Sequence, residues 1–168
     1  FSFFTANCRK ESCKTSTFNH GDPLYLFFKT PIEGFLAVYM IENKEAFRLL
    51  PYRNMPAIYS QAVPVKADQE YLFFSPLDDK GYFEDFSTHL VDEMVMLAEN
   101  GDEFTNLIIV FSTDEFVKPN MVNGFMESGQ QHEIPMSLTA KSLQNWLEIN
   151  RINNENFYYR QLTLKIVH

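Results

Sequence analysis

The chain has 168 residues and a formal net charge of −8, and aromatic residues make up 15% of it. This length fits one domain that buries its own core, and the acidic balance argues against nucleic acid as a partner, because nucleic-acid binding needs Lys and Arg gathered on one face. No apolar run approaches the roughly 18 to 20 residues that span a bilayer, so we expect no membrane insertion within this segment.

Residues 1–20 mix polar, charged and small residues, and we expect them to form an N-terminal arm on a single domain of residues 21–168. The two cysteines of the chain, Cys8 and Cys13, lie in this arm. A disulfide between them would close a tight polar loop and would indicate an oxidising compartment, whereas two free thiols are the alternative. A metal site would need about four ligands, and the one nearby candidate is His20, so no metal site is predicted.

Three apolar runs divided by two short turns follow between Asp22 and Pro51. The runs are Leu24–Thr30, Phe35–Glu42 and Ala46–Leu50. This pattern is typical of a three-strand antiparallel meander. Because both faces of the middle run are apolar, we expect that strand to lie in the centre of a packed structure.

Further short strands are predicted in the middle of the chain, at Val63–Val65 and Tyr71–Phe74. Residues Val91–Glu99 alternate in a way that suits either a strand or a short helix. The turn residues Asn100–Asp102 favour a strand, because they predict a hairpin into the β-prone run Asn106–Ser112.

Helical signals lie in the second half of the chain. Thr113–Phe116 resembles a single capped turn. From Thr139 to Arg151 the apolar period becomes that of a helix, with Leu143 and Leu147 on one face. Phe157–Val167 then returns to the alternation of a strand. This order of elements predicts a mainly β fold, an antiparallel β-sandwich with one α-helix of the C-terminal half packed on it.

The sequence contains no motif of a known catalytic or cofactor site. Its four histidines are scattered, no serine lies in a Gly-x-Ser-x-Gly elbow, and there is no glycine-rich phosphate loop. We therefore predict no catalytic residues, no metal and no cofactor.

Binding residues are expected in three loops, at Tyr52–Ala62, Leu77–His89 and Lys118–Pro135. Aromatic side chains are less expected in loops, and those found here either form a sugar- or protein-binding platform or cover the ends of the sandwich. These candidate binding residues are Tyr52, Tyr59, Tyr82 and Phe83.

The acidic residues 78–85 form either a solvated turn or an oxygen-rich calcium loop, although they lack the alternating ligand spacing of such a loop. Carboxylates of this region are also candidates for a carbohydrate-active hydrolase, which needs two carboxyl groups facing each other across a cleft. These carboxylates are Asp78, Asp79, Glu84, Asp85, Asp92 and Glu93.

Several segments together resemble an uncharacterised bacterial family, catalogued as domain of unknown function four-three-eight-four. The segments are Gly21-Asp22, Gly34–Tyr39, Phe47–Pro51, Tyr71–Phe74, Glu103–Ser112 and Leu143–Leu147 with the final strand. The resemblance implies an envelope or secreted module without established catalytic residues.

The leading hypothesis is therefore a non-catalytic recognition or assembly module of a bacterial cell-envelope or secreted protein, with a protein or a glycan as its partner. A glycan-binding module and a carboxylate-dependent hydrolase are the alternatives.

Overall fold

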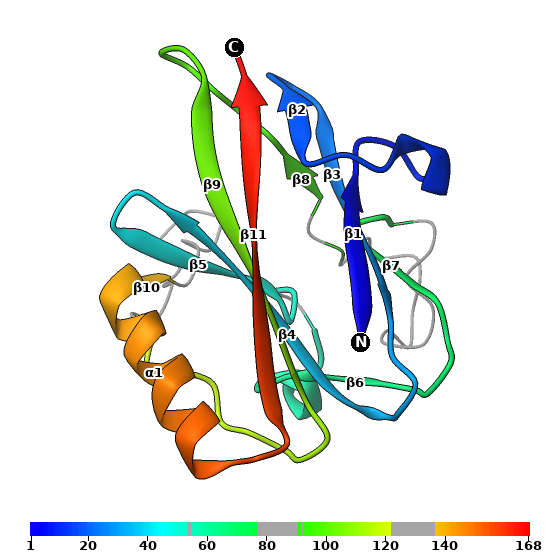
Figure 1. The fold of residues 1–168 in the computed structure, drawn as a ribbon, viewed down its shortest axis with the longest axis vertical. Coiled ribbons are helices and arrows are strands. Elements are labelled where there is room, and N and C mark those ends of the chain that lie inside the picture. Colours follow the sequence, from blue (N-terminus) through cyan, green and yellow to red (C-terminus); the bar gives the residue numbers. More distant parts are fainter. Residues whose placement is uncertain (54, 77–90, 92, 122–136) are drawn as a thin grey trace, which may run out of the picture.

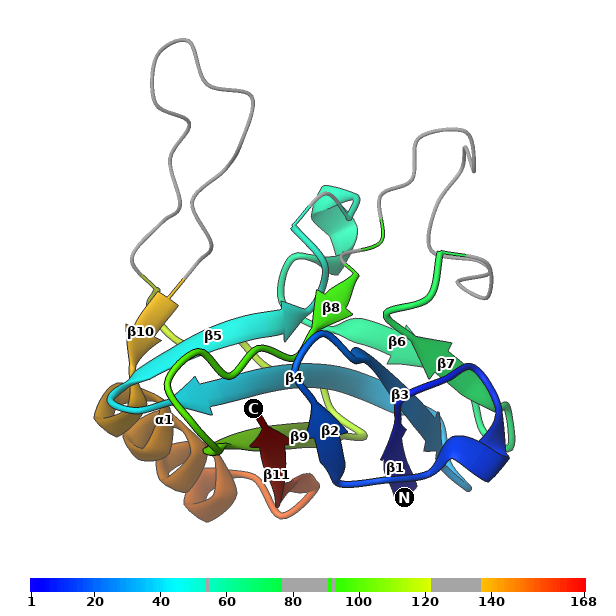
Figure 2. The same ribbon diagram turned by 90° about the horizontal axis from the view of Figure 1, so that it is seen from above.

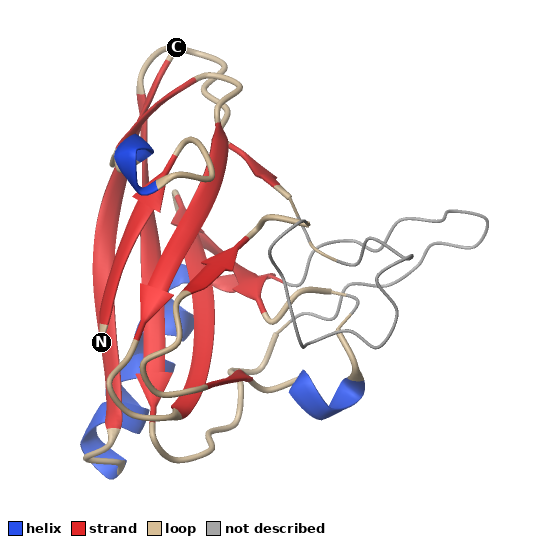
Figure 3. Ribbon diagram, turned by 90° about the vertical axis from the view of Figure 1, so that its right-hand side faces the viewer, coloured by secondary structure: helices blue, strands red, loops and turns tan. Residues whose placement is uncertain are grey.

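A computed structural model shows a β-sandwich with one helix packed against it, as the sequence predicts (Figure 1). The structure describes residues 1–53, 55–76, 91, 93–121 and 137–168. The long strands of both sheets run lengthwise through the molecule (Figure 3).

The smaller sheet has the order β1–β3–β7, with β8 pairing with β3. Its strands are β1 (Ser2–Ala6), β3 (Pro23–Lys29), β7 (Tyr71–Phe73) and β8 (Met94–Val95). The larger sheet has the order β10–β5–β4–β9–β11–β2, with β6 pairing with β4. Its strands are β2 (Thr17–Asn19), β4 (Gly34–Glu42), β5 (Glu45–Leu50), β6 (Val63–Val65), β9 (Glu103–Ser112), β10 (Ser137–Thr139) and β11 (Phe157–Val167).

Strands β4 and β9 are apolar on both faces because both faces of the larger sheet are covered. One face packs against the smaller sheet through residues such as Leu36, Val38 and Ile109. The other face packs against the helix α1 (Ala140–Asn153) through residues such as Tyr39 and Val110. Figure 2 shows α1 and the smaller sheet on opposite sides of the larger sheet. The expected central position of the Phe35–Glu42 strand is thus confirmed.

The helix begins and packs as its sequence predicts. The Thr139 hydroxyl accepts a hydrogen bond from the backbone N–H of Ser142 at 3.1 Å, which caps the first turn. Leu143 and Leu147 are buried on the face that meets the sheet. Arg151 lies in the last turn, where a positive charge complements the helix dipole.

The predicted meander is wrong in its first strand. β4 and β5 form a hairpin, but β3 pairs with β1, β7 and β8 in the other sheet. The chain crosses between the sheets after β3, where the Thr30 carbonyl accepts from the N–H of Asp68 at 2.8 Å. Both arrangements bury the same apolar residues, so the pattern alone does not distinguish them.

Two expectations for the second half also need correction. Among the described residues of the run Val91–Glu99, only the two-residue strand β8 forms, and β8 pairs with β3 instead of making a hairpin with β9. Met96 and Ala98 beyond β8 are nevertheless buried, which explains why the run is apolar. No helical turn forms at Thr113–Phe116; Phe116 instead inserts its ring beside Trp146 and Phe157.

The first 20 residues, expected to form an arm, contribute a strand to each sheet. β1 is antiparallel to β3, and β2 is parallel to the end of β11. Phe18 of β2 is fully buried between the sheets. The small and polar residues of this segment concealed its alternation from a sequence-based prediction.

Candidate functional site

A cleft of about 460 Å³ lies where the two sheets meet at one end of the sandwich. The start of β4 and β6 lie side by side there, with β7 of the other sheet nearby (Figure 1). Two tyrosines, two charged residues and an amide line it, together with small apolar surfaces. The lining residues are Glu33, Gly34, Phe35, Tyr59, Pro64, Val65, Lys66, Gln69, Tyr71 and Thr113.

Tyr59 and Tyr71 supply the aromatic surfaces of the cleft from two different elements. Tyr59 ends the short 3-10 helix Ala57–Tyr59, and its partly buried ring packs against the main core. Tyr71 begins β7, and its ring lies parallel to that of Phe73 with centroids 5.6 Å apart. Both rings are thus held by the core and still line the cleft.

The hydroxyl of Tyr71 organises the loop beside the cleft. It accepts a hydrogen bond from the backbone N–H of Lys66 at 2.8 Å. This bond fixes the end of β6 relative to β7, and so joins one sheet to the other at the cleft. The exposed side chains of Glu33, Lys66 and Gln69 supply a carboxylate, an ammonium and an amide around the tyrosines.

Gly34, which lines the cleft, also lies where the backbone of β4 approaches the end of β9 very closely. A Cβ atom added at Gly34 would contact the Ser112 carbonyl oxygen and would lie 2.7 Å from the Phe111 ring. Any larger residue would therefore push β4 away from β9.

The structure places the predicted binding residues in different environments. Tyr59 lines the cleft. For Tyr52 the structure favours the packing role over the surface platform, because this residue is 1% exposed and packs in the core between the sheets. Its hydroxyl accepts a backbone hydrogen bond there, so the ring is available for packing and not for a ligand. Tyr82 and Phe83 lie outside the described residues.

The sequence does not single out Tyr71 and Phe35 as site residues, because both belong to apolar strands whose pattern indicates core residues. The signal for Tyr71 was its position at the first residue of a short strand, next to the polar residues Gln69 and Glu70. A tyrosine at a strand end presents an apolar body and a polar tip to a partly solvated site.

Among the described residues, no group of three His, Cys, Asp or Glu side chains is arranged to hold a metal ion. Of the carboxylates considered for a hydrolase, Glu93 is exposed next to β8. The other five, and the acidic residues 78–85 considered as a solvated turn or a calcium loop, lie outside the described residues.

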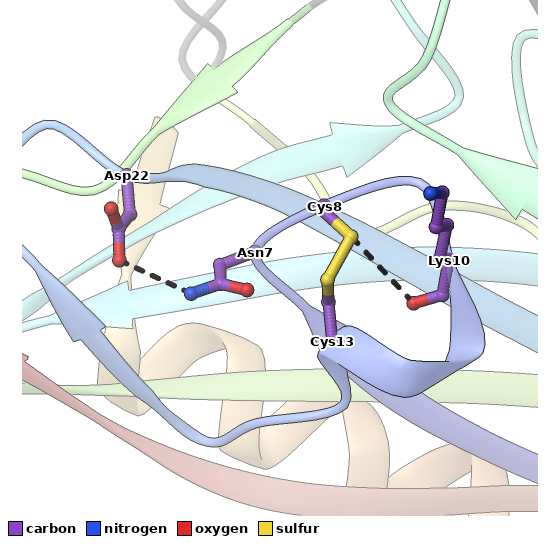
Figure 4. The surroundings of a disulfide bond; sticks show 5 residues. All are labelled: Asn7, Cys8, Lys10, Cys13 and Asp22. Atoms are coloured by element: carbon purple, nitrogen blue, oxygen red, sulfur yellow. Dashed lines mark hydrogen bonds between the residues drawn. A yellow bond between two sulfur atoms is a disulfide. The ribbon is translucent and has the colours of Figure 1, made fainter.

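Cys8 and Cys13 are joined by a disulfide that closes the loop after β1 (Figure 4). The loop is attached to the turn before β3, because the Asn7 amide donates to the Asp22 carboxylate at 3.5 Å. The same carboxylate accepts from the backbone N–H of Asn19 at 2.8 Å. The disulfide loop is thus a structural part of the sandwich end, distant in sequence from the residues of the cleft.

In the part of the chain that the structure describes, no helix has the length and apolar character needed to cross a membrane. Comparison of the chain with models of protein families, with curated proteins and with solved structures gives no match. The family suggested by the sequence therefore stays a prediction, and the function must be inferred from the geometry of the site.

Proposed function

We propose that this protein is a non-catalytic recognition module of a bacterial cell-envelope or secreted protein, and that it binds a glycan in the cleft between Tyr59 and Tyr71. The observation that carries the proposal is the combination of two core-supported tyrosines with a carboxylate, an ammonium and an amide around one cleft. Sugar rings have apolar C–H faces and many hydroxyl groups, so they need aromatic surfaces and mixed donors and acceptors in the same place.

The mixed charge of the cleft supports a neutral ligand. Glu33 and Lys66 carry opposite charges, so the cleft has no strong preference for either an anion or a cation. A glycan hydroxyl can donate to the Glu33 carboxylate and accept from the Lys66 ammonium. The charged and amide side chains of this cleft are exposed to solvent. Such a cleft suits a binding module better than an enzyme, because many reactions need a buried site from which water is excluded.

The disulfide supports the proposed location. Disulfides form and persist in secreted and envelope compartments and are rare where thiols are kept reduced. The bond between Cys8 and Cys13 therefore agrees with a protein that folds outside the cytoplasm.

Binding to an array of bacterial and host oligosaccharides tests the proposal, with each hit measured by calorimetry. Tyr59→Leu removes the ring while keeping an apolar side chain, and it should weaken a hit by about fivefold, because an aromatic contact contributes about 1 kcal/mol beyond its area. Tyr59→Phe keeps the ring and should retain most of the affinity.

Ile58→Ala is the matched control, because Ile58 is 83% exposed in the same short helix and does not line the cleft. This variant should bind as the unmodified protein does. An array without hits, or hits whose affinity is the same in Tyr59→Leu, would overturn the glycan proposal.

A further inference from the structure

The outer edge of β11 is only partly covered. β9 pairs with β11 along its length on one side, from Phe157 to Ile166. On the other side β2 pairs only with residues 165–167, close to the C-terminal end of β11 (Figure 1). Along residues 157–163 that edge has no strand partner in the described parts of the chain.

The pairing of β11 with β2 at residues 165–167 shows which backbone groups of β11 point to this edge. The N–H of Lys165 donates to the Ser16 carbonyl at 2.9 Å, on the side of β2. Alternate residues of a strand direct their N–H and C=O groups to the same edge. Tyr159, Gln161 and Thr163 therefore point their backbone donors and acceptors outward, where no described backbone group pairs with them.

This edge lacks most of the features that usually protect a strand from pairing. Residues 157–163 contain no proline and no acidic residue, and their register with β9 is continuous, without a bulge. Natural edge strands are commonly shortened, bulged, covered or charged to prevent the addition of another strand. Arg160 is the one charged residue of this stretch, and Tyr158 beside it is 51% exposed.

A cavity of about 800 Å³ lies along the first part of this stretch, residues 157–160. Phe1, Ile32 and Phe111 give it apolar walls, and Arg160 brings a positive charge to it. At the far side Glu155 and Arg151 also line it, and Arg151 is paired with Glu148 at 2.7 Å. The Arg160 guanidinium lies 4.6 Å from the centre of the Phe1 ring and donates to the Phe1 carbonyl at 3.0 Å. Because successive side chains of a strand alternate between two faces, every second side chain of an added strand would face this cavity.

We propose that the outer edge of β11 binds an extended segment of another protein by strand addition, with an acidic side chain of that segment beside Arg160. The free backbone groups of Tyr159, Gln161 and Thr163 supply main-chain hydrogen bonds, and the cavity supplies selectivity for the side chains. Strand β2 shows that this edge accepts a short added strand, since it is joined to β11 by such bonds within the chain itself.

Charge favours another protein over a second copy of this chain. A symmetric antiparallel pairing that uses all of residues 157–163 is centred on residue 160, and it places the two Arg160 side chains directly opposite each other. Like charges at opposed positions of a sheet are destabilising. Each copy also carries a net charge of −8, which adds repulsion.

A library of displayed random seven-residue peptides is the probe, with affinities of the selected peptides measured by calorimetry. Gln161→Pro is the blocking variant: it removes an N–H that faces outward, so the bonds to β9 remain, while its ring obstructs an added strand. Gln161→Ala is the matched control, because it changes the side chain and keeps the N–H. Gln161→Pro should weaken binding by about tenfold or more, and Gln161→Ala should leave it nearly unchanged.

Charge reversal provides the second readout. The selected peptides should be enriched in Asp or Glu, and Arg160→Glu should weaken them. Backbone amide signals of Tyr159, Gln161 and Thr163 should gain protection from hydrogen exchange when peptide binds. Tyr59→Leu should not affect peptide binding, which separates this site from the glycan cleft.

Three results would overturn the proposal. The first is a library in which no selected peptide loses affinity for the Gln161→Pro variant, provided that the circular dichroism spectrum shows this variant to be folded. Peptides that bind without protecting the three amides would also do so. A dimer in analytical ultracentrifugation that is abolished by Gln161→Pro would show that a second copy is the occupant.

Discussion

The hydroxyl of Tyr52 accepts a hydrogen bond from the backbone N–H of Phe74 at 2.8 Å, in the core between the two sheets. Phe74 follows β7 with φ at 69°, in the left-handed region that non-glycine residues rarely occupy. Its N–H is directed into the core, where water cannot replace the tyrosine oxygen. Tyr52 thus stabilises an unfavourable backbone conformation from 22 residues away.

Tyr52→Phe should therefore destabilise the protein although it keeps the ring. The substitution leaves the buried N–H of Phe74 without this acceptor, at a cost of about 1–3 kcal/mol in the free energy of unfolding. Urea unfolding followed by circular dichroism measures the change. An unchanged unfolding midpoint would show that the hydroxyl contributes nothing to the fold.

Tyr39→Phe is the matched substitution with the opposite expected sign. Tyr39 is fully buried between β4 and α1, and its hydroxyl has no hydrogen-bond partner among the described residues. Burial also raises the pKa of this hydroxyl. Because removing an unpaired buried hydroxyl relieves its desolvation cost, Tyr39→Phe should raise the free energy of unfolding by about 1 kcal/mol. The same urea titration gives the answer, and a destabilised variant would reveal an unrecognised partner.

These two tyrosines show what the sequence can predict about the fold and what it cannot. The sequence correctly places Tyr39 in a strand with two apolar faces. Successive side chains of a strand point to opposite faces, and here both sets of side chains are apolar, which indicates burial on both sides. The same kind of pattern predicts β3 as a strand but not its partners, since strand pairing depends on long-range contacts that leave no local signal. The helix α1 was predictable because its cap and its apolar face are both local.

The candidate site was less accessible to sequence reasoning than the fold. Tyr52 and Tyr59 lie in one loop and look equivalent in sequence, yet one is buried and the other lines the cleft. Tyr52 packs against core residues distant in sequence, such as Phe74, and these long-range contacts leave no signal in the loop itself. Tyr71 shows the converse, because it belongs to an apolar strand and yet lines the cleft.

Removal of the disulfide should destabilise the protein by a modest amount. Cys8 and Cys13 are five positions apart. Closing so short a loop lowers the conformational entropy of the unfolded chain, which adds about 2 kcal/mol to the free energy of unfolding. The double variant Cys8→Ser, Cys13→Ser should unfold at lower urea concentration than the oxidised protein, and at the same concentration as the reduced protein. An intact mass without the loss of two hydrogens in the unreduced protein would contradict the disulfide itself.

Glu148 connects the helix to the sheet and makes stability depend on pH. Its carboxylate accepts from Arg151 Nη2 at 2.7 Å and from the Tyr159 hydroxyl of β11. The hydrogen bond from Arg151, followed by that from Tyr159, lowers the pKa of Glu148. Since the folded pKa lies below the unfolded one, the stabilisation is fully present above the unfolded pKa and is lost as the pH falls through the folded pKa.

Glu148→Gln should therefore lower the urea midpoint at about pH 7, and the difference from the unmodified protein should disappear at a second, acidic pH below the lowered pKa of Glu148. Glu115→Gln is the control, because Glu115 is exposed and forms no hydrogen bond or ion pair with the described residues. It should shift the midpoint little at either pH. An effect of Glu148→Gln that is the same at both pH values would contradict this prediction. The carboxylate would then not stabilise the fold through its charge, and the variant would be less stable because the geometry of its amide does not suit the two hydrogen bonds.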